Sequence, residues 1–99
     1  MEEHRGFFRL TNKGEIHATA ASEELDVINI SSSGVLVIKK KSNFSKRGIL
    51  ELQINNFTMN LHYQILRTIK DTMVLVFKID EEINKLLVVL KKLRDEQKT

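Results

Sequence analysis

Two segments on either side of Asn55 and Asn56 constrain the fold of this chain more than any other feature. Every second position is apolar in residues 49–54, and again in residues 57–65. These positions are Leu50, Leu52 and Ile54, then Phe57, Met59, Leu61, Tyr63 and Ile65. A period of two is that of a β-strand with one buried face, and paired asparagines tolerate the positive φ of a two-residue hairpin turn. The chain is therefore predicted to contain antiparallel strands joined by short turns.

Further strands are predicted on both sides of this hairpin. They cover residues 15–21, 25–30, 35–39 and 73–79, with turns at residues 12–14 and 70–71 and a bulge at residues 65–66. Val74 and Val76 make the last of these strands apolar on both faces. Such a strand is expected to lie centrally or under a helix.

Residues 80–97 are predicted to form a terminal helix. Asp80 can cap it, acidic residues begin it and basic residues end it, as the helix dipole favours. One apolar stripe runs along it, formed by Ile83, Leu86, Leu87, Leu90 and Leu93. Val88 and Val89 widen the stripe and leave room for a homodimer contact. The pattern thus predicts an all-β protein of five or six strands with one terminal helix, and closure into a barrel would remove the edge strands.

Length and composition exclude several classes of protein. With 99 residues, a net charge of +3 and no cysteine, the chain is expected to be a single domain without disulfides or thiolate metal ligands. No apolar run approaches the ~20 residues of a membrane span and no signal-peptide core is present, so we expect a cytoplasmic protein. The three histidines are scattered, and no nucleophile elbow or phosphate-binding glycine loop occurs. We expect no enzyme activity, metal or cofactor.

A polar segment interrupts the apolar strands between residues 28 and 35. Three serines end in Gly34. Small residues fill a core poorly, so we expect the strand to bend or bulge here and to expose backbone and hydroxyl donors. Asn29 and Ser31 offer hydrogen-bonding groups, and Gly34 allows a ligand to approach the main chain.

Two arginines near the N-terminus could supply positive charge to this segment. Arg5 and Arg9 flank Gly6, which makes a turn easy, and Phe7 and Phe8 are expected to anchor the arm that carries them. The guanidinium fork suits phosphate oxygens and the O6/N7 edge of guanine. A phosphorylated purine is therefore the expected ligand.

The pattern Arg5-x-x-x-Arg9 followed by Asn29-x-Ser31-x-x-Gly34 resembles the two-part signature of PilZ domains, bacterial receptors for cyclic di-GMP. The resemblance implies a six-stranded antiparallel β-barrel over residues 14–79, a C-terminal α-helix over residues 80–97, and a mobile ligand-gripping arm over residues 1–10. It also implies that both arginines grip phosphate oxygens and a guanine edge. Asn29 would face the guanine, Ser31 would donate to phosphate, and Gly34 would allow close approach.

This resemblance implies a non-catalytic receptor for a second messenger that signals to an unidentified partner protein, in motility or biofilm regulation. Two positions depart from the commonest pattern. Many relatives have aspartate where this chain has Asn29, and a carboxylate would accept two hydrogen bonds from guanine where an amide accepts one. His4 stands where many relatives carry another arginine, which leaves open whether one ligand or a stacked pair binds.

Two alternative functions remain open at this stage. The first is a PilZ-like adaptor that binds no nucleotide and acts through its helix and sheet surfaces. The second is a small barrel that binds nucleic acid through the basic residues 39–47, with Phe44 as a stacking platform. The small number of aromatic residues disfavours the second alternative, and a basic loop of this kind is usually a solvated face.

Overall fold

The computed structural model describes residues 9–38 and 45–97. Within these ranges the elements are β1 (Leu10–Thr11), β2 (Ile16–Ala20), β3 (Glu23–Ser31), β4 (Gly34–Ile38), β5 (Arg47–Ile54), β6 (Phe57–Ile69), β7 (Thr72–Phe77) and α1 (Asp80–Gln97). Residues 1–8 of the predicted N-terminal arm and residues 39–44 of the basic loop lie outside the described residues.

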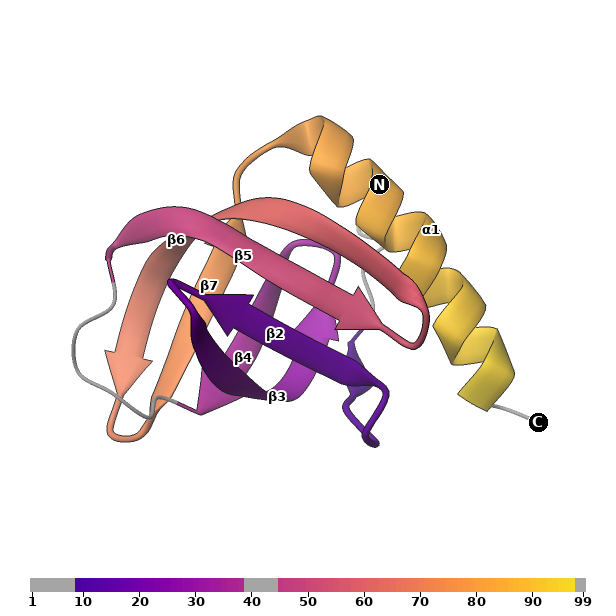
Figure 1. The fold of residues 1–99 in the computed structure, drawn as a ribbon, viewed down its shortest axis with the longest axis horizontal. Coiled ribbons are helices and arrows are strands. Elements are labelled where there is room, and N and C mark those ends of the chain that lie inside the picture. Colours follow the sequence, from indigo (N-terminus) through magenta and orange to yellow (C-terminus); the bar gives the residue numbers. More distant parts are fainter. Residues whose placement is uncertain (1–8, 39–44, 98–99) are drawn as a thin grey trace, which may run out of the picture.

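Six of the strands form a closed barrel, whose course can be followed in Figure 1. All pairings are antiparallel, and the order β3-β2-β5-β6-β7-β4 returns to β3 through the β3–β4 pair. The short strand β1 lies outside this ring and pairs with the end of β3. The prediction of a six-stranded antiparallel barrel with one C-terminal helix is confirmed.

The core follows the alternation of the sequence. Residues at every second position of the paired strands are almost completely buried, among them Ile16, Ile30, Val35, Leu50, Leu52, Leu61 and Leu75. The strand β7 lies between β6 and β4, as each strand of the closed ring lies between two others, so the expected central position does not set it apart. One of its apolar faces is buried and the other is partly buried. Phe57 departs from the pattern, because it is 40% exposed beside the turn at the end of the β5–β6 hairpin.

The predicted turns and the bulge are present. Asn55 and Lys70 adopt positive φ values of 52° and 51° in the turns that join β5 to β6 and β6 to β7. The register of β6 against β7 shifts between Ile65 and Arg67, which makes Leu66 the extra residue of a bulge.

The prediction that one strand bends at the serines is wrong. β3 ends at Ser31, β4 begins at Gly34, and these two residues pair, so Ser32 and Ser33 form a tight turn between two antiparallel strands. A separate register shift lies between Val27 and Asn29. Ser31 and Ser32 are only 4% and 0% exposed, so the expectation of solvent-exposed hydroxyls is wrong for these two serines. Ser33 is exposed.

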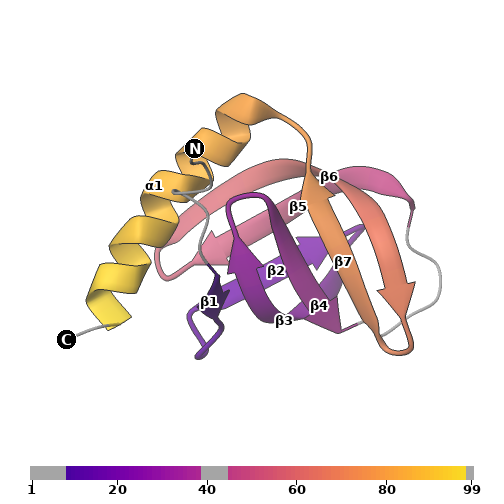
Figure 2. The ribbon, with the colours of Figure 1, turned by 180° about the vertical axis from the view of Figure 1, so that it is seen from behind.

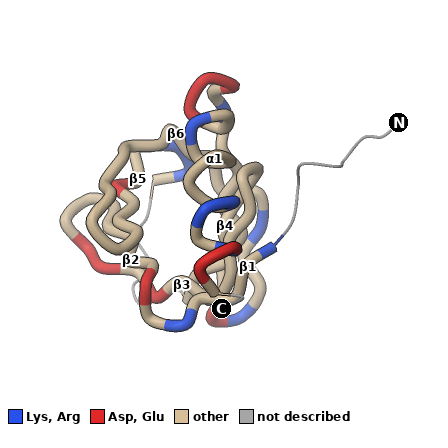
Figure 3. The backbone as a smooth tube through the Cα atoms, turned by 90° about the vertical axis from the view of Figure 1, so that its right-hand side faces the viewer, with Lys and Arg blue, Asp and Glu red and all other residues tan. Residues whose placement is uncertain are grey.

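The helix α1 packs along one side of the barrel against β6 (Figures 1 and 2). Leu86, Leu90 and Leu93 of the predicted stripe are buried. Ile79, which was predicted to end the last strand, instead directly precedes the helix. Its carbonyl accepts a hydrogen bond from the Ile83 N–H at 2.9 Å, so Ile79 takes the N-cap position that was predicted for Asp80. The acidic first turn of α1 lies at the top of Figure 3. No helix within the described ranges is long and apolar enough to cross a membrane.

Candidate functional site

The strand β1 places the start of the described chain beside the serine turn. Leu10 pairs with Ile30 and Thr11 pairs with Asn29. Leu10 is buried, so it anchors this short strand in the core. The residue that precedes β1 is therefore held next to the end of β3.

Asn12 fixes the course of the chain after β1. Its backbone N–H donates to the Ile28 carbonyl at 2.9 Å, and its side-chain Nδ2 donates to the Val27 and Ile16 carbonyls at 3.0 and 2.9 Å. Its Oδ1 accepts from the Gly14 and Ile16 N–H groups at 2.9 and 3.1 Å. One amide thus joins β1, β2 and β3 and ties the N-terminal segment to the site. From the sequence, Asn12 is predicted only to lie in a turn.

Arg9 and Asn29 are in direct contact. The Arg9 guanidinium donates through Nη1 to Asn29 Oδ1 at 2.7 Å. Since a guanidinium can only donate, the carboxamide must turn its oxygen toward Arg9, which leaves the Asn29 Nδ2 donors free of this contact. The remaining Arg9 donors and this amide therefore favour acceptor groups, such as phosphate oxygens or the O6/N7 edge of guanine.

Ser31 is engaged within its own turn. Its Oγ lies 3.0 Å from Ser33 Oγ, accepts from the Ser33 N–H at 3.2 Å and lies 3.5 Å from the Gly34 carbonyl oxygen. Ser33 is exposed, so its hydroxyl lies between Ser31 and solvent. The Ser32 hydroxyl is buried and has no hydrogen-bond partner among the described residues. A ligand above this turn would therefore meet Ser33 as well as the predicted Ser31.

Gly34 has a structural reason for being glycine. A Cβ at this position would lie 2.6 Å from the Leu75 carbonyl oxygen, which is closer than side-chain carbons approach backbone oxygens. The backbone that approaches Gly34 in this structure is thus that of β7. Its predicted contact with a ligand stays a prediction, as do those of Arg9, Asn29 and Ser31. Arg5 lies outside the described residues.

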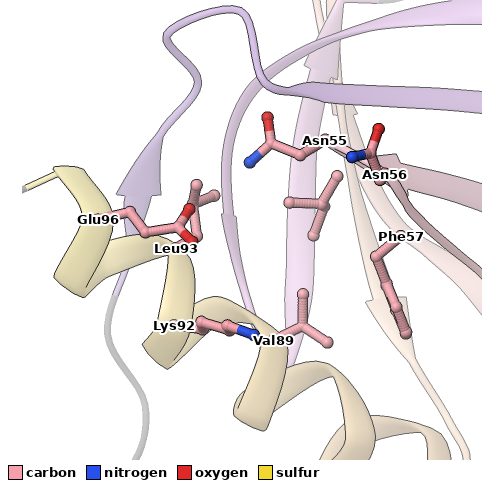
Figure 4. Close-up of a pocket in the computed structure, with 8 residues that line it drawn as sticks. Asn55, Asn56, Phe57, Val89, Lys92, Leu93 and Glu96 are labelled. Atoms are coloured by element: carbon pink, nitrogen blue, oxygen red, sulfur yellow. The ribbon is translucent and has the colours of Figure 1, made fainter.

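Two grooves beside α1 lie away from these residues. One of about 350 Å³ is bounded by the β5–β6 turn and the second half of α1 (Figure 4). Another of about 690 Å³ lies between β6 and the first half of the helix. Their shared lining residues are Phe57 and Val89. These grooves form a surface beside α1 that is separate from the Arg9–Asn29 contact.

The charges of α1 oppose one form of the predicted homodimer. Val88 is 67% exposed on the outer face of the helix. In an antiparallel pair of helices centred between Val88 and Val89, Lys85 of one copy would face Lys92 of the other, and Glu81 would face Glu96. Like charges at opposed positions are unfavourable. The homodimer itself stays a prediction.

Within the described residues, no group of three or more His, Asp or Glu side chains could hold a metal ion. The fold and the site define a small closed β-barrel in which an arginine directly precedes a short N-terminal strand that pairs with one hairpin. A model of the PilZ-like family, described as PilZ domain-like, matches residues 9–98. The chain belongs to this family.

Two solved structures show how far the similarity extends. An uncharacterized protein from Legionella shares 46% sequence identity, with a TM-score of 0.90, and the match covers 93% of this chain and 99% of that one. The PilZ domain of CeSA from a cellulose-synthesizing bacterium shares 12% identity and a TM-score of 0.58 over 85% of this chain and 98% of that domain. The second likeness is one of fold. A comparison with curated proteins finds no significant match.

Proposed function

We propose that this protein is a cytoplasmic, non-catalytic receptor that binds cyclic di-GMP and signals to a partner protein. The observation that carries the proposal is the 2.7 Å hydrogen bond from Arg9 to Asn29. These residues belong to the two halves of the signature and are 20 positions apart in the sequence, yet they meet on one surface. The membership of the chain in the PilZ-like family adds support, since PilZ domains are generally binding domains without catalytic activity.

The charge of the ligand suits this surface. Cyclic di-GMP carries two phosphates, and each arginine can present two parallel N–H donors to phosphate oxygens or to the guanine edge. Arg9 is exposed, so part of its interaction with the ligand would be screened by salt. The complex is expected to weaken as ionic strength rises.

Calorimetric titration of the full chain with cyclic di-GMP tests the proposal. Arg9→Ala should weaken binding by tenfold or more, because hydrogen bonds to a charged group contribute about 1.5–3 kcal/mol. Lys91→Ala removes an equal charge from the exposed face of α1 and is the matched control. Wild-type protein that shows no binding heat, or an Arg9→Ala variant with unchanged affinity, would contradict this assignment.

A nucleotide-independent adaptor is the second candidate, and one observation favours it. Asn29 Oδ1 already accepts from Arg9, and the Ser31 hydroxyl is already engaged by Ser33, so these polar groups satisfy one another without a ligand. A ligand that binds only the folded state raises the thermal midpoint. A midpoint that does not move in excess cyclic di-GMP would support the adaptor.

A further inference from the structure

The strand register extends the candidate site across the barrel. Asn29 of β3 pairs with Leu36 of β4, Leu36 pairs with Val74 of β7, and Val74 pairs with Arg67 of β6. Directly paired residues of antiparallel strands project to the same face of a sheet. These four side chains therefore form one row, with Asn29 at one end and Arg67 at the other.

This row lies on the outside of the barrel. The neighbouring row, which alternates with it, contains Ile30, Val35 and Leu75, whose side chains are at most 1% exposed and fill the core. Leu36 and Val74 are only partly buried, and Arg67 is exposed. The outward direction of the row thus follows from the burial of its neighbours.

A second outward row runs parallel to the first. It begins at the pair Ser31 and Gly34 and continues through Val76 of β7 and Gln64 of β6. Because Gly34 has no side chain, no side chain projects from the surface between Ser31 and Val76. Leu36, Val74 and Val76 together form what we call the β4–β7 platform.

The β4–β7 platform is apolar and is not covered by the helix. α1 packs against β6 on another side of the barrel, and Figure 2 shows the strands β4 and β7 facing the viewer with α1 to one side. Val74 and Val76 are the residues that make β7 apolar on both faces. They lie on its outer face and do not pack in the barrel core.

Cationic side chains stand at both ends of the first row. Arg9 is held at the Asn29 end by its 2.7 Å hydrogen bond, and Arg67 stands three strands away. With strands about 4.8 Å apart, the row spans about 14 Å. Within the described part of the chain, the Arg67 guanidinium has no hydrogen bond or ion pair. No other described residue therefore competes with a ligand for these donors.

We infer that the β4–β7 platform is the floor of an extended ligand site and that Arg67 is a further ligand-binding residue. This inference rests on the proposed function and names the part of the molecule that would hold the second half of a cyclic purine dinucleotide. A purine face lies against the aliphatic side chains of Leu36, Val74 and Val76. Arg67 donates to a phosphate or to the guanine O6/N7 edge, as Arg9 does at the opposite end.

The test is a calorimetric titration of the 99-residue chain with cyclic di-GMP. Arg67→Ala should weaken binding about tenfold or more, since a charge-assisted hydrogen bond is lost. Arg67→Lys keeps the charge without the planar fork and should fall between the wild type and Arg67→Ala. Lys91→Ala, on the exposed face of α1, is expected to bind like the wild type. Arg67 is exposed, so these variants should fold, and a thermal melt without ligand checks this.

Backbone amide NMR signals give an independent measurement. Titration with cyclic di-GMP should shift the Val74 and Val76 signals as well as that of Asn29, while the signal of Asn84 on α1 stays in place. Wild-type binding together with unchanged affinity of Arg67→Ala would overturn this inference and leave the proposed function intact. Loss of all binding in the wild type would overturn the proposed function, and the extended site with it.

Discussion

The contact between Glu82 and His62 should contribute measurably to the stability of the fold. Glu82 lies in the first turn of α1, and its Oε1 accepts from the His62 backbone N–H at 2.8 Å while its Oε2 lies 2.9 Å from His62 Nδ1. Lys78 directly follows the end of β7, and its N–H donates the last hydrogen bond from this segment to the His62 carbonyl. The carboxylate thus closes the ladder at the point where the helix begins.

The free energy that this contact contributes depends on how exposed the two side chains are. Hydrogen bonds to a charged group contribute about 1.5–3 kcal/mol when sheltered, and less when water competes. The side chain of His62 is 49% exposed and that of Glu82 is 21% exposed. We therefore expect Glu82→Ala to lower the free energy of unfolding by about 1–2 kcal/mol. For a domain of this size that corresponds to a decrease in Tm of roughly 5–10 °C.

Thermal unfolding followed by circular dichroism measures this effect, with Glu81→Ala as the control. Glu81 is exposed in the same helical turn, so its loss removes an equal favourable interaction with the helix dipole, about 0.3–1 kcal/mol. The difference between the two variants isolates the contacts to His62. Glu82→Gln, which keeps one acceptor, should fall between them. Equal Tm values for Glu81→Ala and Glu82→Ala would refute this reasoning.

Three further outcomes are expected. Gly34→Ala should lower stability by about 1–3 kcal/mol in urea unfolding, because the new Cβ would press on the Leu75 carbonyl; an unchanged midpoint would argue against this. Ser32→Ala should leave Tm unchanged or raise it, since it removes a buried hydroxyl without a partner. The pKa of Glu15 is lowered from its ordinary value of 4.5, first by a hydrogen bond from its own backbone N–H and also by Gln97. The stability that this carboxylate contributes is therefore present above about pH 4.5 and is lost as pH falls through the lowered pKa. In thermal unfolding, Glu15→Gln should have a lower Tm than the wild type at neutral pH, and the two Tm values should converge in acid.

The strands and the helix could be predicted because their signals are local. The alternation around Asn55, the apolar residues of β7 and the stripe along α1 each mark a periodic element with a buried face. Each is found at its predicted place. The period shows which face of a strand or helix is apolar, and in a small barrel that face packs toward the core.

The serine hairpin was missed because its turn lacks the usual signature. Two-residue hairpins commonly need positive φ at their centre, which asparagine and glycine supply. Among the described residues that are not glycine, positive φ occurs at Ala21, Ser22, Asn55 and Lys70, and not at Ser32 or Ser33. The turn between β2 and β3 shows the converse, because Ala21 and Ser22 take positive φ without a favourable residue type. Side-chain identity alone therefore gave no signal at either turn.

The meeting of Arg9 and Asn29 depends on a contact that has no period. β1 contains two residues, too few to show alternation, and its position is set by the burial of Leu10 and by the hydrogen bonds of Asn12 to three strands. The resemblance to PilZ domains supplied this juxtaposition in advance. The rows that connect Asn29 to Arg67 depend on the pairing of four strands, and they could be identified only once the register was known.

The contact between Arg9 and Asn29 is better understood as organising the site than as blocking it. A guanidinium has five N–H donors, and Asn29 Oδ1 uses one of them, so the same arginine can hold the amide and a phosphate together. An exposed arginine otherwise loses side-chain entropy when it grips a ligand, and the amide already restricts it. Removal of Asn29 would then weaken binding partly by releasing Arg9. For this reason the losses caused by Arg9→Ala and Asn29→Ala should sum to more than the loss in the double variant, which is the behaviour of two residues that act as one unit.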